Sequence, residues 1–453
     1  MQIATDAAAS WSAARPDITK DFQRDADVHS TFWTKGYELL AALPGKRKRN
    51  PEQARAAETI LTTGRETRET FMRQHAASVY AALTKNQTNF VRADILAYEA
   101  ANLVPGLVPT RAQVYAQGDK MQSEKDGIEV DQGIFFSHIL ARPDTGTHFC
   151  HAMLLPRAES LARLDDFKAR GAVDLGTAAV MRQGKAATVL MRNPRYLNAE
   201  DETTLQQTEI AVDLATLDPV SELCVLRGDT VDHPKYAGKH VFCTGINLTH
   251  IYHGRISYMW FVTREMGFVN KMMRGLARPD ISPDDIYCAT IEKPWVAGVE
   301  AFAIGGGCQY LLTMDYVVAA SDAYMTLPAR KEGIIPGAAN MRLPRFTGDR
   351  IARRAIVSGL RLDCDTPEGR MICDEIVPPG TMDAALERVI AGFTDSGVVS
   401  AAGNRRAFRV SEEPLDQFRR YMAVYAREQA YCHFSPALIA NLEKHWNAQQ
   451  RKM

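Results

Sequence analysis

The feature that most restricts the fold is a series of short apolar runs that alternate with helical or long connecting segments. Runs of this length without polar alternation are typical of strands that are buried on both faces of a parallel sheet. Between the first two, segment 198–218 has the apolar spacing of a helix. This order predicts βαβ units and an α/β core. The expected strands are 187–191, 223–226, 241–243, 295–299 and 317–320.

The 453-residue chain is long enough for more than one domain. Helical spacing of apolar residues before the core predicts a long helix over 52–83, and a helical region is expected over 348–377. We expect three consecutive parts: a mostly helical N-terminal domain over 1–180, the α/β core over 181–395, and a charged, aromatic and helical tail over 396–453.

Composition restricts the classes of partner. Lys plus Arg equals Asp plus Glu at 54 each, so the chain has no general attraction for nucleic acid or an anionic membrane. No apolar run approaches the ~18 residues of a membrane span, and the start lacks the apolar stretch of a signal peptide. The eight cysteines show no CxxC spacing, which favours reduced thiols and a cytoplasmic location.

Two glycine-bearing turns carry the candidate chemistry. Residues 242–248 (Phe-Cys-Thr-Gly-Ile-Asn-Leu) and 303–309 (Ala-Ile-Gly-Gly-Gly-Cys-Gln) each follow an expected strand, and the second precedes an expected helix over 309–314. Glycine lets the backbone approach a ligand closely, and a helix start exposes N–H donors. Two such turns side by side could form an oxyanion hole. The alternative is that the glycines only pack a helix against a strand.

A set of collinear motifs within residues 185–390 resembles the enoyl-CoA hydratase/isomerase (crotonase) family. The resemblance implies a crotonase-like ββα spiral core that binds an acyl-CoA thioester and stabilises its enolate. It implies that the backbone N–H groups of Ile246 and Gly306 form the oxyanion hole, with Gly245, Asn247, Leu248 and Gly305 beside the substrate. The motifs are 192–199, 242–248, 293–308, 333–338, 342–345, 358–360 and 374–377.

The chain departs from the hydratase pattern at two positions. Hydratases of this family carry one carboxylate just after the glycine run and another in the next loop, a pair suited to general acid–base catalysis. Gln309 and Ala329 stand there instead, and Glu332 lies three positions from the second site. An arylacetyl-CoA would suit such a site because its ring makes the adjacent carbon acidic. Its enolate, held in an apolar pocket, can give an electron to dioxygen, and the resulting peroxide can attack the thioester.

The missing carboxylates and the helical N-terminal part together resemble one branch of the family, the cofactor-independent dioxygenases of glycopeptide-antibiotic biosynthesis. That resemblance implies 3,5-dihydroxyphenylacetyl-CoA and O2 as substrates, the arylglyoxylate and free CoA as products, and no metal or organic cofactor. The family also implies a homo-oligomer, a trimer or a dimer of trimers. Two alternatives stay open: a conventional hydratase, isomerase or thioester hydrolase that uses Glu332 or Glu200 as base, and a non-catalytic scaffold with this fold.

Polar residues are expected to recognise the two ring hydroxyls. The candidates are Glu200, Arg264 and Gln309. Glu200 could instead be a first-turn carboxylate that the helix dipole favours. Arg264 could instead be a solvated surface charge or part of a salt bridge.

Coenzyme A carries phosphates, so basic residues are expected near the first glycine turn. His233, Lys235 and Tyr236 lie in the insertion before that turn, which could equally be a surface hairpin without a ligand. By resemblance, Arg195 and Leu197 lie near the adenine. Arg405 and Arg406 in the tail are weaker candidates of the same kind.

Metal binding and cysteine nucleophiles are not expected. The pairs His148/His151 and His250/His253 have i,i+3 spacing but lack the glutamate of an HExxH motif. Cys243 and Cys308 flank the proposed hole and are interpreted as small packing residues.

Overall fold

A computed structural model describes residues 2–283 and 290–453 of the chain. The chain forms two compact units. The helical unit comprises residues up to Ala152, Thr249–Phe261 and Phe418–Met453, and the sheet unit comprises Met153–Leu248 and Val262–Gln417. The sheet unit therefore takes in residues 153–180 and the helical unit takes in 418–453, whereas the sequence predicted boundaries near 180 and 395.

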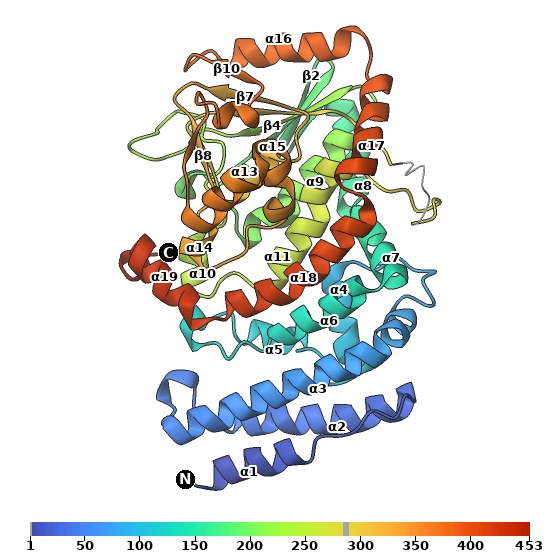
Figure 1. Cartoon of the computed structure of the whole chain (residues 1–453). Helices are drawn as coiled ribbons and strands as arrows, with labels where there is room; N and C mark the ends of the chain where they lie inside the picture. The colour runs from blue at the N-terminus through green and yellow to red at the C-terminus, as the bar shows by residue number, and fades with distance from the viewer. Residues whose placement is uncertain (1, 284–289) are drawn as a thin grey trace. The chain divides into compact units, whose positions relative to one another are not determined.

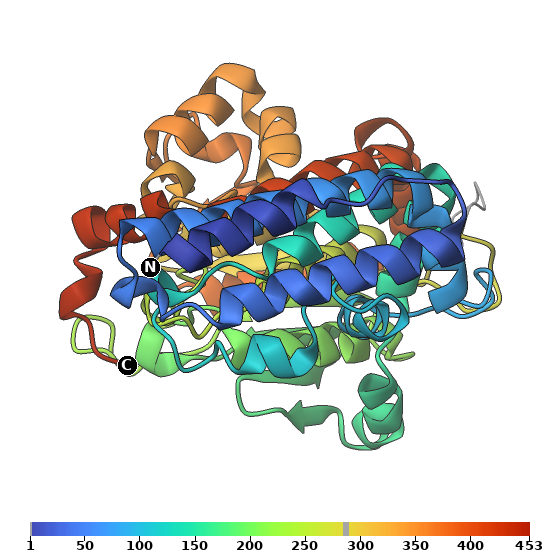
Figure 2. The ribbon, with the colours of Figure 1, turned by 90° about the horizontal axis from the view of Figure 1, so that it is seen from below.

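The helical unit begins with three helices that lie side by side (Figure 1), and Figure 2 shows the long α2 and α3 from below. Asn50 and Gln53 form a capping box that starts α3, which confirms the helix predicted over 52–83. The helices of this unit are α1 (Gln2–Ala13), α2 (Phe22–Ala41), α3 (Pro51–Leu83), α4 (Ala93–Leu103), α5 (Arg111–Tyr115), α6 (Val130–Ala141), α7 (Pro143–Leu154), α10 (Leu248–Tyr252), α11 (Tyr258–Arg264), α18 (Leu415–His433) and α19 (Pro436–Trp446), with α7, α10, α11 and α18 each extending past the unit's edge.

Aromatic side chains hold α2 against α3. The Trp33 and Phe71 rings are edge to face with centroids 5.3 Å apart, and both side chains are almost fully buried. The Trp33 indole Nε1–H donates to Thr67 Oγ1 at 2.9 Å, so its one polar atom is satisfied. Ring burial of this kind makes a large contribution to stability.

The sheet unit is built on a seven-stranded sheet of order β1-β2-β3-β4-β5-β7-β10. The two pairings among β1, β2 and β3 are antiparallel, and the remaining pairings are parallel. Four of the five predicted strands are confirmed. The strands are β1 (Ala172–Asp174), β2 (Ala178–Gln183), β3 (Ala186–Met191), β4 (Leu223–Gly228), β5 (Trp295–Val299), β7 (Tyr316–Ala320) and β10 (Glu375–Val377).

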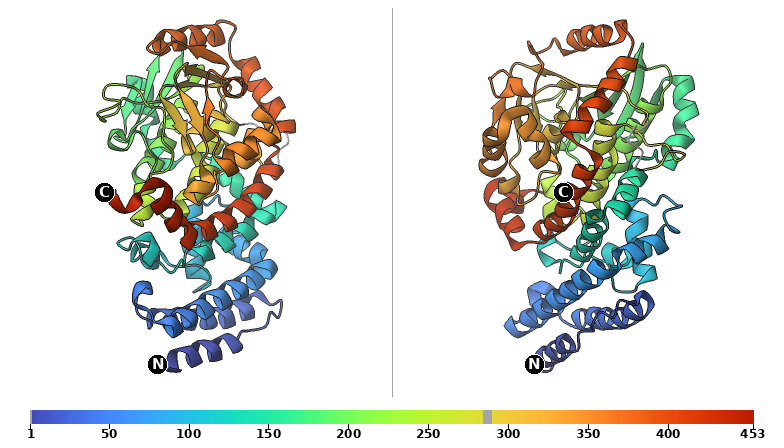
Figure 3. Two further views of the ribbon diagram at one scale, coloured as in Figure 1. Left: turned by 60° about the vertical axis from the view of Figure 1, so that its left-hand side comes forward. Right: turned by 45° about the vertical axis from the view of Figure 1, so that its right-hand side comes forward.

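Helices cover both faces of this sheet, which explains its continuous apolar strands. On one face, Ile210 and Leu214 of α9 (Glu202–Leu217) share a buried cluster with Val189 and Leu226. On the other, Leu386 of α16 (Met382–Asp395) packs among strand residues. Figure 3 shows α16 along the sheet in both of its views. The α/β core and the helical N-terminal region agree with the predicted fold class.

A second sheet positions the candidate site. It has the order β6-β8-β9, with β6 (Phe302–Ile304) parallel to β8 (Tyr324–Thr326) and β8 antiparallel to β9 (Leu362–Asp363). Helix α13 (Gly306–Leu311) starts one residue after Gly305, three residues earlier than the predicted 309–314. The other helices of this unit are α8 (Ala158–Arg170), α12 (Asn270–Arg274), α14 (Ala329–Glu332), α15 (Ala339–Arg353) and α17 (Val399–Glu412).

Two predictions about elements are wrong. Residues 241–243 form no strand, and Cys243 makes only an isolated parallel bridge to Ala303. The helical prediction over 348–377 holds as far as the π-helical turn that ends at Ser358, after which β9 and β10 follow. Short strands at the ends of sheets carry too few residues for a clear periodicity. Within the described residues, no helix has the length and apolarity that a bilayer span requires.

Changing Phe71 to Ala tests the core of the helical unit. Because the ring is fully buried against Trp33, its loss leaves a cavity and should lower the free energy of unfolding by about 3–5 kcal/mol. Urea unfolding followed by tryptophan fluorescence measures the change. Val28→Ala on α2, where the side chain is 48% exposed, is the control and should change it by less than about 0.5 kcal/mol. Equal effects of the two changes would contradict this packing.

Candidate active site

The structure brings the two glycine turns into backbone contact. A Cβ atom on Gly245 would lie 2.8 Å from Gly306 N and 2.7 Å from Ile304 O, so a side chain at 245 has no room. Gly245 has φ 75° and Gly305 has φ 52°, in the region that favours glycine. The turns therefore need these glycines both for their conformation and for their close approach.

The first turn is fixed by the segment that leads into α9. Glu200 N donates to Gly245 O at 2.8 Å, and Asn247 N donates to Glu200 O at 2.7 Å. Thr244 Oγ1 lies 3.2 Å from the carbonyl oxygens of both Tyr196 and Leu197. These bonds place Ile246 opposite Glu200 in an isolated parallel bridge.

Two backbone N–H groups remain available as donors where the two glycine turns meet. Gly306 is the first residue of α13, where a helix leaves its N–H groups without intrahelical acceptors. In the described part of the chain, neither the Ile246 N–H nor the Gly306 N–H donates a hydrogen bond. Ile246 is 8% exposed, so its amide also lies in a largely dry environment. Both amides can therefore donate to an added oxygen.

Arg264 is the centre of a buried polar network beside these amides. Its Nε donates to Glu200 Oε1 at 2.7 Å, its Nη1 to Gln309 Oε1 at 2.6 Å and its Nη2 to Gly306 O at 3.2 Å. Only 2% of the residue is exposed. The solvated surface charge considered for Arg264 is thus excluded, whereas the salt bridge considered for it is confirmed, because Arg264 pairs with Glu200 and Glu265. Glu200 precedes the N-cap of α9 and pairs with Arg264, so it is not a first-turn helix carboxylate either.

Two further members of the network were missed by the sequence analysis. The Tyr310 hydroxyl donates to Glu200 Oε1, and its ring centroid lies 4.8 Å from the Arg264 guanidinium carbon. Glu265 accepts from Arg264 Nη1 and, at 3.1 Å, from Ala338 N. Tyr310 could have been suspected because it follows Gln309 on a helix start, whereas no sequence signal marks Glu265.

Burial and charge set the protonation of this network. Burial raises the pKa of the Tyr310 hydroxyl well above its usual value, which keeps it a neutral donor. Burial opposes the charged form of Arg264, but Glu200, Tyr310 and Glu265 outweigh it and raise the pKa of the guanidinium. The network is therefore held together by a fixed positive charge between two glutamates.

The network leaves no room for side chains at two glycines. A Cβ atom on Gly306 would collide with Glu200 Oε2 and lie 2.7 Å from Arg264 Nη2. A Cβ atom on Gly337 would collide with the Glu265 carboxylate and lie 2.6 Å from Gln309 Oε1. The polar network thus touches both the start of α13 and the loop before α15.

Glu332 is a separate carboxyl group near the second turn. Its Oε1 lies 4.0 Å from the position of a Cβ on Gly305, and its carboxyl group makes no hydrogen bond to the described residues. Burial raises the pKa of the Glu332 carboxyl to about 7. Ala329, at the position of a hydratase carboxylate, is buried. A carboxyl group with this pKa can take up or release a proton near neutral pH.

Three of the five residues predicted to bind CoA lie close to one another. Leu197 and Tyr236 pack against one small apolar cluster, and the Tyr236 ring lies 5.4 Å from the Phe302 ring in an edge-to-face arrangement. Lys235 Nζ is 5.2 Å from the Tyr236 ring centroid.

The other two predicted CoA residues lie at the margin of this cluster. The His233 ring is 5.7 Å from that of Tyr236. Arg195 is exposed and lies over the Tyr196 ring at 5.2 Å. Leu248 is the first residue of α10.

The cysteines beside the turns are packing residues. Cys243 and Cys308 are both fully buried, and burial raises the pKa of the Cys308 thiol to about 12 and also raises that of Cys243. The described residues contain no group of three or more His, Cys, Asp or Glu side chains that could hold a metal ion. His148 Nδ1 instead lies 2.7 Å from the Tyr80 hydroxyl, and His253 Nε2 lies 3.1 Å from Arg451 O.

Comparison with solved structures finds chains of similar fold at low identity. An enoyl-CoA hydratase from Mycobacterium avium subsp. paratuberculosis K-10 matches with a TM-score of 0.49 and 18% identity, over 59% of this chain and 98% of that one. An enoyl-CoA hydratase/isomerase from Xanthobacter autotrophicus Py2 matches with a TM-score of 0.49 and 19% identity, over 61% and 96% of the two chains.

Sequence comparison finds a much more similar relative. The (3,5-dihydroxyphenyl)acetyl-CoA 1,2-dioxygenase of Amycolatopsis orientalis is 46% identical over 394 residues, which cover 87% of this chain and 89% of the relative. The crotonyl-CoA hydratase of Syntrophomonas wolfei subsp. wolfei is 24% identical over 252 residues, or 55% and 87% of the two chains.

The family model for enoyl-CoA hydratase/isomerase matches residues 182–402, the segment that contains both glycine turns, Arg264 and Glu332. The 394 residues aligned with the dioxygenase exceed that segment, so the likeness extends into the rest of the chain. The chain therefore belongs to the enoyl-CoA hydratase/isomerase (crotonase) family.

Proposed function

We propose that this protein is a dioxygenase that converts 3,5-dihydroxyphenylacetyl-CoA and O2 into 3,5-dihydroxyphenylglyoxylate and CoA. The observation that carries the proposal is the 46% identity, over 87% of the chain, to a (3,5-dihydroxyphenyl)acetyl-CoA 1,2-dioxygenase. The site supports it because Gln309 and Ala329 replace the two carboxylates that hydration of a double bond needs.

The reaction begins with formation of an enolate. The Glu332 carboxylate takes one proton from the carbon between the ring and the thioester. The carbonyl oxygen becomes negative and accepts hydrogen bonds from the Ile246 and Gly306 amides, whose geometry is fixed before the substrate binds. Donors fixed in this way typically contribute about 10²–10³ in rate each. The aryl ring delocalises the remaining charge.

Dioxygen then reacts with the enolate without a metal or an organic cofactor. The enolate transfers one electron to O2, and the two radicals combine to form a carbon–oxygen bond. The terminal peroxide oxygen attacks the thioester carbon, the C–S bond breaks, and CoA leaves as a thiolate that takes up a proton. The O–O bond breaks as the second proton leaves the α-carbon. One oxygen atom becomes the keto oxygen and the other enters the carboxylate, so both atoms of O2 are used.

The buried network serves to position the ring. Gln309 and Glu200 offer an amide donor and carboxylate acceptors, which match the donor and acceptor of a phenolic hydroxyl. Arg264 holds both side chains, at 2.6 Å and 2.7 Å, so their positions do not depend on the substrate. Gly245, Asn247, Leu248 and Gly305 complete the surroundings of the thioester.

The CoA arm is proposed to lie along the cluster that includes Leu197 and Tyr236, with His233, Lys235 and Arg195 toward its phosphates. A homo-oligomer, a cytoplasmic location and a role in supplying dihydroxyphenylglycine for vancomycin-type glycopeptide antibiotics are parts of the same proposal. They rest on the family resemblance and, for the location, on cysteine usage.

Glu332 also supports a second candidate function. A single carboxyl group with a pKa of about 7 near the hole could support conventional isomerase or thioester hydrolase chemistry. Such an enzyme would turn over without oxygen, and a scaffold protein would not turn over at all.

Oxygen dependence separates these functions. Purified protein with 3,5-dihydroxyphenylacetyl-CoA should consume O2 and release CoA in a one-to-one ratio, measured with an oxygen electrode and a thiol reagent. Crotonyl-CoA is the control and should give neither signal. CoA release at an undiminished rate under argon would identify a hydrolase, and the absence of CoA release under air would favour a scaffold.

Changing Gly306 to Ala tests the oxyanion hole. The added Cβ would displace Glu200 Oε2 and Arg264 Nη2, so kcat/KM should fall by about 10²–10³. Gly392→Ala is the matched control, because a Cβ there meets no atom within 4 Å, and it should leave kcat/KM unchanged. Circular dichroism of both variants checks the fold. A well-folded Gly306→Ala protein with full activity would contradict the assignment.

The pH profile tests Glu332 as the base. Its carboxyl must be deprotonated to act, and burial raises its pKa to about 7, so kcat/KM should fall as the pH drops below 7. Glu332→Gln should remove this acidic limb and lower kcat/KM by about 10²–10⁴. Glu387→Gln, at an exposed position on α16, should keep both the limb and the rate. An unchanged profile in Glu332→Gln would move the base elsewhere.

A further inference from the structure

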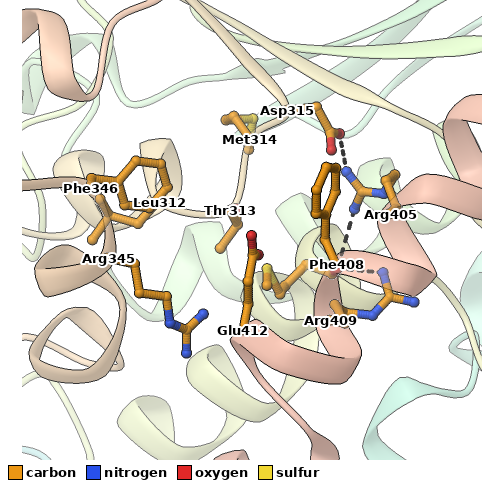
Figure 4. A pocket seen from close by; sticks show the side chains of 11 residues that line it. Leu312, Thr313, Met314, Asp315, Arg345, Phe346, Arg405, Phe408, Arg409 and Glu412 are labelled. Atoms are coloured by element: carbon orange, nitrogen blue, oxygen red, sulfur yellow. Dashed lines mark hydrogen bonds and ion pairs between the residues drawn. The ribbon is translucent and has the colours of Figure 1, made fainter.

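A cavity of about 150 Å³ in the sheet unit is lined by none of the candidate active-site residues (Figure 4). Its walls come from Met273, from residues 312–315 after α13, from Arg345 and Phe346 of α15, and from residues 405–412 of α17. Arginines and aromatic rings dominate these walls. The proposed dioxygenase reaction does not use this cavity.

Three arginines meet a single buried carboxylate behind one wall. Glu413 accepts from Arg274 Nη2 at 3.0 Å, from Arg342 Nε and Nη2 at 2.9 Å each, and from Arg345 Nη1 at 3.2 Å. Burial alone would raise the pKa of the Glu413 carboxyl, but the arginines outweigh it and lower the pKa to about 2. One buried carboxylate thus holds three arginine side chains together at this wall.

Arg345 is the member of this trio that lines the cavity. Glu413 is its only hydrogen-bond acceptor among the described residues, and its Nη2 is buried without an acceptor. The side chain as a whole remains 22% exposed. A guanidinium carries five N–H donors, so several remain for a ligand. Leaving a buried donor unpaired is costly, and a bound carboxylate would relieve that cost.

The opposite wall carries arginines and carboxylates in equal number. Arg405, Arg406 and Arg409 all lie within ion-pair distance of Glu292, and Arg405 also pairs with Asp315. Arg405 was a weaker candidate for binding CoA. Its ion pairs with Glu292 and Asp315 account for its position without a contact to CoA. With Glu412 in the same wall, three arginines face three carboxylates, so Arg345 is the cation that this wall leaves for a ligand.

The remaining surface of the cavity combines apolar side chains with the polar Thr313, Asp315 and Glu412. Figure 4 shows Phe346 and Leu312 on one side and Phe408 on the other, with Glu412 between them. Phe408 is 59% exposed although it is a large aromatic residue. A cavity of about 150 Å³ has the volume that one benzene-sized ring needs. The site therefore offers a cationic group and an aromatic surface side by side.

We propose that this cavity binds a small aromatic carboxylate, with the carboxylate on Arg345 and the ring between Phe346 and Phe408. A planar guanidinium matches a carboxylate in a two-bond geometry, which a point charge would not. The proposal does not depend on the dioxygenase reaction. An arylglyoxylate such as the proposed product belongs to this chemical class.

Calorimetric titration with benzoylformate, in the absence of any CoA ester, tests the site. Wild-type protein should bind it, and Arg345→Gln should raise the Kd by about 10- to 100-fold, because a charge-assisted hydrogen bond is lost. Arg353→Gln is the matched control on the same helix; that side chain is 68% exposed and pairs only with Asp349 among the described residues, so the Kd should not change. An unchanged Kd in Arg345→Gln would overturn the proposal.

A second variant and a second ligand keep the test independent of folding defects. Glu412 is exposed and repels an anion in the cavity, so Glu412→Gln should lower the Kd by about two- to fivefold. Pyruvate has the same 2-oxo acid without the ring and should bind at least about tenfold more weakly. Equal affinity for pyruvate, or weaker binding by Glu412→Gln, would reject an aromatic carboxylate site. No turnover is measured, so failure here leaves the proposed function untouched.

Discussion

The ion pair between Arg264 and Glu200 is the interaction on which the candidate site depends. Moving a guanidinium from water into the protein interior costs several kcal/mol, and only closely paired acceptors offset that cost. Glu200 lies opposite Ile246, and Gln309 lies in the first turn of α13, so the partners of Arg264 flank both oxyanion amides. Because Arg264 Nη2 also donates to Gly306 O at 3.2 Å, the charge is tied to the backbone of the hole itself. Losing Arg264 would leave Glu200 and Glu265 buried without their shared cation, whereas losing Glu200 would leave Arg264 with Glu265 as its one paired carboxylate among the described residues.

The fold was predictable where burial leaves a clear pattern. Residues 295–299 are apolar throughout and lie in the middle of the sheet, so the predicted bounds of β5 match the structure. Residues 241–243 are equally apolar but pair only through one bridge at Cys243. Their side chains are buried in two core clusters although the segment joins no sheet, and apolar spacing does not separate these two cases. The strands β1, β9 and β10 are too short for any periodicity.

The sequence predicted the backbone turns of the site better than the contacts among its side chains. Gly245, Gly305 and Gly306 indicate tight turns, because a larger residue would have no room there or would rarely adopt the required φ. The pairing of Arg264 with Glu200 joins residues 64 positions apart, and no local signal predicts it. Glu265 is hidden for the same reason. The sequence did supply the chemical types, namely a cation, a carboxylate and an amide, and the structure shows that they form one network.

This site differs from that of a hydratase in which side chains can donate or accept a proton. A hydratase needs one group to deliver water and another to protonate carbon. Here Glu200 is held by Arg264 and Tyr310, and Gln309 cannot exchange a proton, so neither supplies an acid to the α-carbon. In the proposed reaction Glu332 would return a proton only as the reverse of its first step, so the enolate would stay available to O2. Replacing two carboxylates would thus change the fate of the proposed intermediate, while the Ile246 and Gly306 amides proposed to stabilise it keep their places.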